Sequence, residues 1–367
     1  MAILKLLVDF VLFCSILTVY ITKGVIHMTL TNIIANISSL NDKDKEYILD
    51  YLTRHFSPSA SQQGALIGEL RERKFSHGFH CRHCGSTSVV RYGKRDGRQR
   101  YKCKDCYKLS SDLTNSPMYR SKKADKWIPF IECMLIGLSL RETASQIGIT
   151  HVTAFYWRHK VLSALAKESI GIFEGLVEVD ETYFLESHKG RRVIPNRKPR
   201  KRGGSATKRG ISNEQVCVLV ARDRNKTTLS KRVGSGRILM EQIDNTLTSH
   251  FKNDTVLISD AHNSYKSYTI TNDVEHVIIN GSKKEYVKKG IYHLNNINNY
   301  HSRLKKWISR FNGVSTKYLQ LYLVWFQFLD NRKMESDLSK KKQMLILASV
   351  HGTWETADKL RLRNFAF

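Results

Sequence analysis

The sequence is short of acidic residues. Its 367 residues include 33 Asp and Glu against 60 Lys and Arg, which leaves a formal net charge of +27 at pH 7. An excess of positive charge this large favours a polyanionic partner, and nucleic acid is the first candidate. A ribosome-associated or generally basic protein is the alternative. Hydrophobic residues (41%) and aromatic residues (10%) are present in ordinary amounts, so the chain is predicted to be globular, with two or three domains.

Cysteine is also scarce, and its distribution argues against a disulfide framework. Four of the seven cysteines form two tight pairs, Cys81 with Cys84 and Cys103 with Cys106, while the others are scattered singly in apolar runs. The spacing C-x2-C-x18-C-x2-C lies in the range of four-thiolate zinc sites, which are structural because they leave no open position. We predict a zinc ribbon over residues 76–113 with a structural Zn²⁺; four cysteines without a metal are the alternative.

A cleavable signal sequence is missing. Residues 2–22 are strongly apolar, but Lys5 and Asp9 interrupt them and no small-x-small cleavage site precedes Lys23. The run is barely long enough for a membrane helix. We interpret residues 1–27 as an extension from an upstream start codon, with Met28 as the other possible start, and keep a membrane anchor as the alternative. Residues 28–75 are predicted to be a helical segment and a linker, and the protein to be cytoplasmic and nucleoid-associated.

Apolar residues recur at helical spacing between residues 125 and 167, within a predicted helical domain over residues 114–170. The stretch SLRETASQIGITHVTAFYWRHKVL has the pattern of a helix-turn-helix with Gly148 at the turn. The residues expected to face inward are Leu140, Ala144, Ile147, Val152 and Phe155. The residues expected to face outward are Thr150, His151, Thr153, Ala154, Trp157 and Arg158. We predict that Thr150, His151, Thr153 and Arg158 contact DNA; a helical segment that touches no DNA is the alternative.

From residue 171 the hydrophobic period changes to that of strands. The predicted strands are residues 176–184, 214–223, 227–233, 255–260 and 276–280. The predicted helices are residues 236–251, 296–311 and 315–330. Strands followed by strand–helix alternation indicate an α/β domain with a mixed sheet and helices on its faces. We assign this domain to residues 171–335 and a C-terminal tail to residues 336–367, and we find no internal repeat.

Two aspartates follow apolar strand residues, Asp180 in LVEVDETY and Asp260 in TVLISDAHNSY. A carboxylate at the end of a buried strand is costly unless a metal ion or a cation receives it. If the two strands are neighbours, the pair would hold Mg²⁺ or Mn²⁺ for phosphoryl transfer. Taken singly, each aspartate has a structural alternative, the capping of the turn or helix that follows.

The predicted helix over residues 296–311 carries a polar pair beside its apolar stripe. Asn298 and Lys305 are seven residues apart, nearly two turns, so they share one face. Asn298 could supply a neutral oxygen to a metal ion, and Lys305 could contact a phosphate. An exposed Asn and Lys on a basic helix are the alternative.

Over residues 76–330 the chain resembles the DDE-superfamily transposases of bacterial insertion sequences, in the IS1595 branch that joins a zinc ribbon to an RNase H-like domain. The specific motifs are VEVDETYF, LISDAHNSY and the block YHLNNINNYHSRLKKWISRFNGVSTKYLQLYLVWF. The resemblance implies that Asp180 and Asp260 are the first two catalytic acids and that Lys305 contacts DNA. The third acid of the family, usually Glu, falls on Asn298, and some members are similar in carrying Asn there. A neutral amide is a poorer cation ligand than a carboxylate.

The segment from residue 188 to residue 210 is an insertion with ten Lys and Arg in 23 residues. Runs of this kind are commonly solvated charge, and a nuclear-localisation signal has the same composition. Beside a DNA-processing site they are better explained as a clamp on phosphates. The residues predicted to bind DNA there are Arg197, Lys198, Arg200, Lys201 and Arg202.

These observations predict an α/β, RNase H-like catalytic domain preceded by a zinc ribbon and a helix-turn-helix. The expected activity is metal-dependent cleavage and transfer of DNA strands, with Asp180, Asp260, Asn298 and Lys305 as the catalytic residues. The expected partner is double-stranded DNA, both the terminal inverted repeats of the element and the target, bound by a homo-oligomer. A non-catalytic DNA-binding regulator and an RNase H-like nuclease without strand transfer are the alternatives.

Overall fold

The computed structural model describes residues 30–45, 47, 68–69, 71–73, 75–76, 78–95, 98–119, 121–191, 193–194, 197–201, 204–252, 254–351 and 356–363. The chain divides into two compact units, Met1–Gly68 and Glu69–Phe367. In the first unit, helix α2 (Leu30–Ser39) is followed by a short helical stretch from residue 42. The apolar residues 2–22 and most of the predicted linker lie outside the described residues. Of the helices described, none has the length and apolar character needed to cross a membrane.

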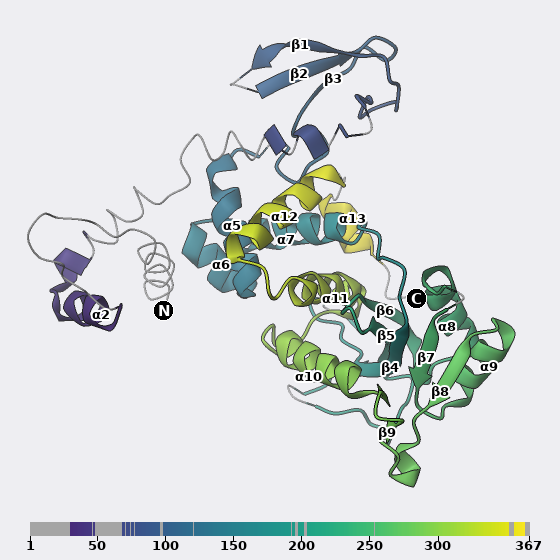
Figure 1. Ribbon diagram of the computed structural model, residues 1–367. Helices are drawn as coiled ribbons and strands as arrows, with labels where there is room; N and C mark the ends of the chain where they lie inside the picture. The colour runs from purple at the N-terminus through teal and green to yellow at the C-terminus, as the bar shows by residue number, and fades with distance from the viewer. Residues whose placement is uncertain are drawn as a thin grey trace, which may run out of the picture. The chain divides into compact units, whose positions relative to one another are not determined.

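Near the start of the second unit is a three-stranded antiparallel sheet (Figure 1). Its strands are β1 (Val89–Arg95), β2 (Arg98–Cys103) and β3 (Leu109–Ser111). Cys103 ends one of these strands, and the other paired cysteines lie in the turns beside it. Strands β1 and β2 pair as an antiparallel hairpin, whose Asp-Gly turn lies outside the described residues, and β3 pairs with β2. Tyr101 is buried and its hydroxyl donates to Asp112 at 2.8 Å. Arg71 also donates to Asp112, which fixes the module to the segment before it.

A helical bundle follows the cysteine-containing sheet. It is formed by η1 (Ala124–Lys126), α5 (Trp127–Ile136), α6 (Leu140–Ile147) and α7 (His151–Leu165). Ser139 and Glu142 form a reciprocal capping box at the start of α6, and Gly148 adopts the left-handed conformation that ends it. Helix α12 (Asp337–Val350) packs against α5 and α7, and α13 (Ala357–Leu362) follows it. The prediction of a C-terminal tail was therefore wrong over these two helices, because α12 completes the bundle core.

The α/β part of the chain is built on a mixed sheet in the order β6-β5-β4-β7-β8. The strands are β4 (Leu176–Leu185), β5 (Gln215–Asp223), β6 (Thr228–Ser235), β7 (Val256–Ser259) and β8 (Glu275–Ile278). Strands β4, β5 and β6 are antiparallel neighbours, whereas β7 runs parallel to β4 and β8 parallel to β7. The five predicted strands and the mixed sheet are confirmed.

Helices cover both faces of this sheet. On one face, α8 (Met240–Leu247), followed by η2 (Thr248–His250), and α9 (Asn263–Thr271) pack on a core that includes Val177, Val179 and Leu257. On the other face lie α10 (Asn295–Ser309) and α11 (Thr316–Asn331), and the Tyr300 hydroxyl pairs with Ser230 of β6 at 2.8 Å. Between β8 and α10 the chain forms η3 (Gly281–Lys283), β9 (Val287–Lys288) and β10 (Tyr292–His293).

Candidate active site

The parallel pairing of β4 with β7 brings the two predicted aspartates to one edge of the sheet. Leu176 pairs with Val256 and Glu178 with Ile258, and this register, continued by two residues, sets Asp180 level with Asp260. Asp260 directly follows the last residue of β7, as predicted. Asp180 does not end its strand, because β4 continues to Leu185 in antiparallel pairing with β5. It lies instead where β4 extends beyond the end of its neighbour β7.

Asp180 lies in an unfavourable place for a charge. Burial, and next the repulsion by Asp260, raise the pKa of the Asp180 carboxyl to about 6, against a smaller opposing effect of Lys305. One oxygen of Asp260 accepts the backbone N–H of His262 at 2.9 Å. Within the described part of the chain, neither aspartate forms a salt bridge with Lys or Arg. Two adjacent carboxylates without a close cation are a donor set that suits a divalent metal ion.

Glu181 does not take the place of the missing third acid. Side chains alternate along a strand, so Glu181 lies on the face opposite Asp180, where the buried hydroxyl of Tyr265 donates to its carboxylate. Burial raises the pKa of Glu181 to about 7. The Glu181 carboxyl is therefore already hydrogen-bonded to α9, on the face of the sheet opposite Asp180.

Helix α10 contacts Asp180 through a residue that was not predicted. The Nδ1 atom of His301 lies 3.6 Å from the Asp180 carboxylate, and burial lowers the pKa of His301 to about 4. His301 follows Tyr300 of the buried stripe, so its helical position was visible in the sequence. The sequence placed Asn298 and Lys305 of this helix at the site with Asp180, but nothing in it singled out His301.

The two residues predicted on this helix are open to solvent, and one of them interacts with Asp180. Asn298 and Lys305 are both solvent-exposed on α10, and Lys305 is close enough to Asp180 to favour its ionised form. Among the described residues, no three carboxylate or imidazole ligand atoms gather within 4.8 Å of one another. The site is therefore an open pair of aspartates beside a basic helix and not a closed metal cage.

The four paired cysteines do form a closed group. Their sulfur atoms all lie within 4.8 Å of one another, with Cys81 and Cys106 at 3.5 Å and Cys84 and Cys103 at 3.7 Å. The backbone N–H of Cys106 points at the sulfur of Cys103 and lowers the pKa of that thiol to about 6. This group could hold a metal ion, and four thiolates are the ligand set of structural zinc.

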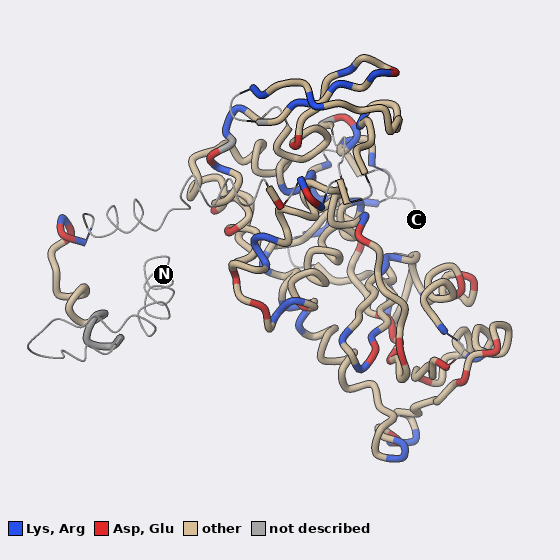
Figure 2. Tube along the Cα trace, turned by 45° about the horizontal axis from the view of Figure 1, so that its top comes forward, with Lys and Arg blue, Asp and Glu red and all other residues tan. Residues whose placement is uncertain are grey.

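Lys and Arg positions recur along the β1–β2 hairpin (Figure 2). Arg91, Lys94 and Arg95 are exposed on β1. Lys102 of β2 lies 5.3 Å from the ring centre of the exposed Tyr92. Cations held against an exposed ring form a surface suited to a phosphate backbone.

Of the six residues predicted to face outward at the second helix of the helix-turn-helix, three are buried and three are at least partly exposed. Ala154, Trp157 and Arg158 are buried, whereas Val152, predicted to anchor the helix, is 47% exposed. Helix α7 packs against α6, α11 and α12, so it is the centre of the bundle and only its first turn is open to solvent. Thr150 caps that turn by accepting the backbone N–H of Thr153 at 3.2 Å, and His151 is exposed beside it.

Arg158 has a structural role in place of the predicted DNA contact. Its guanidinium donates to the carbonyl of Leu138 at 2.7 Å and lies 4.9 Å from the ring centre of Trp325. Trp325 belongs to α11, whereas Leu138 lies between α5 and α6. The buried cation therefore fastens the helical bundle to the helix that covers the sheet.

The basic insertion is tied to the domain through several of its charges. Arg197 and Arg200 both donate to the carbonyl of Glu186, and Arg200 also pairs with the Glu214 carboxylate at 3.2 Å. Lys198 and Lys201 are exposed. Arg202 lies outside the described residues. The two lysines are thus better placed for phosphate than the two arginines, whose guanidinium groups already have protein partners.

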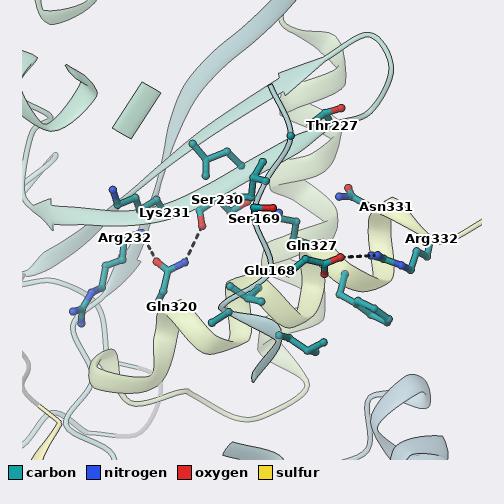
Figure 3. Close-up of a pocket in the computed structure, with 17 residues that line it drawn as sticks. Glu168, Ser169, Thr227, Ser230, Lys231, Arg232, Gln320, Gln327, Asn331 and Arg332 are labelled. Carbon is teal, nitrogen blue, oxygen red and sulfur yellow. Dashed lines mark hydrogen bonds and ion pairs between the residues drawn. The ribbon is translucent and has the colours of Figure 1, made fainter. Parts of the chain in front are cut away.

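A cavity of about 460 Å³ lies away from the aspartates (Figure 3). It is bordered by β6, α11 and the segment from Leu165 to Gly171, and it contains none of the predicted catalytic residues. The Gln320 side chain accepts the N–H of Arg232 at 2.8 Å and donates to the carbonyl of Ser230 at 3.0 Å. Because β6 is an edge strand, Gln320 occupies backbone groups that another strand could pair with.

Comparison with known proteins identifies the domain around the two aspartates. The ISXO2-like transposase domain family matches residues 172–331, which contain β4 to α11. This match shows a transposase domain of the IS1595 family in residues 172–331 of the chain. The DDE resemblance expected from the motifs is confirmed.

Two further similarities of the transposase were found. The "Uncharacterized protein in transposable element ISH50" of Halobacterium salinarum (strain ATCC 700922 / JCM 11081 / NRC-1) is 28% identical over 267 residues, which are 71% of this chain and 87% of the relative. Among solved structures, a chain in "Crystal structure of a pre-cleavage Mos1 transpososome" matches with 9% identity and a TM-score of 0.21, covering 62% of this chain and 79% of that one.

Proposed function

We propose that this transposase binds the ends of its element and catalyses metal-dependent DNA strand cleavage and strand transfer in an RNase H-like domain. The observation that carries the proposal is the placement of Asp180 level with Asp260 at the edge of the sheet, inside the matched transposase domain. In each chemical step the P–O bond to the attacking oxygen forms as the bond to the leaving 3′-oxygen breaks; the attacking group gives up a proton to water and the leaving oxygen takes one up. Attack by water therefore leaves a 5′-phosphate and a free 3′-hydroxyl, whereas attack by a 3′-hydroxyl forms a new phosphodiester. Water is the first attacking group and a DNA 3′-hydroxyl the second.

Asp180 and Asp260 fit a divalent cation because their carboxylates repel one another and, among the described residues, neither forms a salt bridge with Lys or Arg. Mg²⁺ or Mn²⁺ held there supplies Lewis acidity to the attacking and leaving oxygens. Asn298 offers a neutral oxygen or orients the site, and Lys305 binds a phosphate of the DNA strand. Both side chains are exposed on α10, as DNA contact requires.

Recognition of double-stranded DNA is assigned to parts outside the aspartate pair. We assign terminal-repeat binding to the basic hairpin over a zinc-loaded cysteine group and to the first turn of α7, with Thr150, His151 and Thr153. Lys198 and Lys201 of the insertion contact DNA phosphates close to the site. Two element ends must be brought together, so a homo-oligomer on DNA is part of the proposal.

A joining assay tests the function. The full chain is incubated with a labelled duplex of its own flanking DNA and a target plasmid, in Mg²⁺ or Mn²⁺. We expect joined product from the wild type. Asp180→Asn and Asp260→Asn should each lower it by about 1000-fold while leaving duplex binding within about twofold, because each removes transition-state stabilisation and not ground-state binding.

The neutral Asn298 favours one second candidate, a DNA-binding regulator derived from a transposase. A regulator would bind the flanking duplex but neither cut nor join it, and the aspartate variants would behave as the wild type does. Cleavage without joined product would instead identify a nuclease. Either result would refute strand transfer.

A further inference from the structure

Glu178 is a buried carboxylate on the same face of β4 as Asp180, two residues before it. Its side chain is 1% exposed, and it has no part in the proposed chemistry. Burying a carboxylate is costly unless donors replace its water shell. The donors that surround Glu178 all come from outside β4.

Three residues donate to this carboxylate from distant parts of the chain. Arg224 donates to Oε1 at 2.5 Å, the amide of Asn296 donates to Oε1 at 2.7 Å, and the backbone N–H of Ile297 donates to Oε2 at 2.9 Å. Arg224 lies just beyond β5, whereas the other two belong to the first turn of α10. The carboxylate thus joins the central strands to the start of one helix.

Helix α10 has little local capping at its start. The residue before its first turn is Leu294, whose side chain accepts no hydrogen bond, and the nearby His293 ring accepts only the N–H of Asn295, at 3.4 Å. The first backbone N–H groups of a helix have no partner inside it, and a negative charge there is favourable. Glu178 supplies both the acceptor and the charge from the neighbouring strand.

Arg224 strengthens the connection on its other side. Its second terminal nitrogen donates to the carbonyl of Ile291 at 2.8 Å, just before β10 and the start of α10. The chain leading into α10 and the first turn itself are therefore held by one buried ion pair. Asn298 is the next residue after Ile297, so its position depends on this attachment.

We propose that Glu178 is a positioning residue that fixes the first turn of α10 and thereby holds Asn298 opposite Asp180 and Asp260. Its effect on catalysis rests on the proposed function. Its effect on the helix does not, because it follows from the hydrogen bonds to Ile297 and Asn296. Glu178 contacts neither DNA nor the reacting phosphate.

The test uses the full chain with Glu178→Gln, which keeps the size of the side chain but removes its charge. The matched control is Asp330→Asn, which removes another buried carboxylate of the same domain, paired with Arg222 and Arg303. Single-turnover joining on the flanking duplex is measured against Mn²⁺ concentration, and duplex affinity is measured without metal. Amide hydrogen exchange is followed separately in the first and last turns of α10.

For Glu178→Gln we expect the half-saturating Mn²⁺ concentration to rise, or the joining rate to fall, by about 10- to 100-fold, as for other residues that orient metal ligands. Duplex affinity should stay within about twofold, and exchange should accelerate in the first turn of α10 but not in the last. Asp330→Asn should lose stability without changing the Mn²⁺ dependence. Glu178→Ala is expected to repeat the effects of Glu178→Gln more strongly.

Unchanged exchange in the first turn of Glu178→Gln would overturn the proposal, whatever the activity. Faster exchange with both a wild-type Mn²⁺ dependence and a wild-type joining rate would overturn it as well, because the helix would then move without consequence for the site. If the wild type joins no DNA in any metal, the proposed function fails while local exchange still decides whether Glu178 holds α10.

Discussion

The imidazole of His301 lies 3.6 Å from the carboxylate of Asp180, which joins the middle of α10 to the middle of β4. Burial lowers the pKa of His301 to about 4, so the ring is neutral at physiological pH and leaves the charge of Asp180 uncompensated. The strand and the helix are in direct contact at the point where the proposed chemistry takes place. The ionised Asp180 therefore lowers the folding stability of the metal-free protein, and this loss can be measured.

Asp180→Asn should stabilise the metal-free protein at pH 8. The raised pKa of about 6 means that the ionised carboxylate is less stable in the folded chain than in the unfolded one. The penalty is complete above the folded pKa and vanishes below about pH 4, where both states are protonated. We expect a gain of about 1 to 3 kcal/mol at pH 8 and none near pH 4, measured by urea denaturation. Glu168→Gln, which removes a carboxylate paired with Arg332, is the control and should show no gain.

His159 should make the protein sensitive to acid. Burial lowers its pKa to about 3, and its Nδ1 is bonded to the carbonyl of Phe155 at 2.8 Å. The free energy of unfolding is therefore highest above the unfolded-state pKa of about 6.5, where His159 is neutral in both states. As the pH falls toward 3, it decreases by up to about 1.4 kcal/mol per pH unit. His159→Gln should flatten this dependence. The exposed His151, changed to Gln, should leave the slope as in the wild type; an equal slope in both variants would contradict the assignment.

Arg158→Met tests whether the second helix of the predicted helix-turn-helix reads DNA along its length. Loss of the hydrogen bond to Leu138 and of the stacking on Trp325 should cost about 2 to 4 kcal/mol of folding stability. The folded fraction should bind the flanking duplex within about twofold of the wild type, because Arg158 is buried. A loss of affinity larger than tenfold, at unchanged stability, would restore the original assignment.

Chelation or Cys103→Ser should unfold the β1–β3 module selectively. The cysteine sulfurs lie close enough to share one ion, and closed thiolate sites contribute their binding energy to folding. We expect bound zinc to be lost and the hairpin to become open to limited proteolysis, while the α/β domain persists. Cys217→Ser is the matched control, since Cys217 is buried in the main sheet and should retain the metal.

Gln320→Ala should expose the edge of the sheet. It leaves the N–H of Arg232 and the carbonyl of Ser230 without their partner, which costs about 1 to 3 kcal/mol. Size-exclusion chromatography after mild heating should reveal more aggregate, because an open edge strand can pair with another chain. Gln327→Ala is the control: Gln327 borders the same cavity, but its side-chain oxygen has no hydrogen-bond partner among the described residues.

Secondary structure was predicted most accurately where apolar residues alternate along a strand or recur at helical spacing. The five strands of the main sheet and the long helices α10 and α11 follow directly from alternating or helical patterns. Helix α12 was missed because its apolar residues were assigned to a tail, although they pack on α5 and α7. The face of α7 was mistaken because periodicity identifies an apolar stripe but not a helix that is enclosed from several sides.

By itself, the sequence determined the chemistry available to this transposase: four cysteines at metal-binding spacing, two aspartates after apolar strand residues, and a basic polar helix. Only the tertiary structure decided which of these meet. The parallel register of β4 and β7 sets Asp180 level with Asp260, and the buried Glu178 binds the start of α10. Such contacts join residues about 80 and 119 positions apart, and their pairing depends on packing between elements that no local pattern encodes.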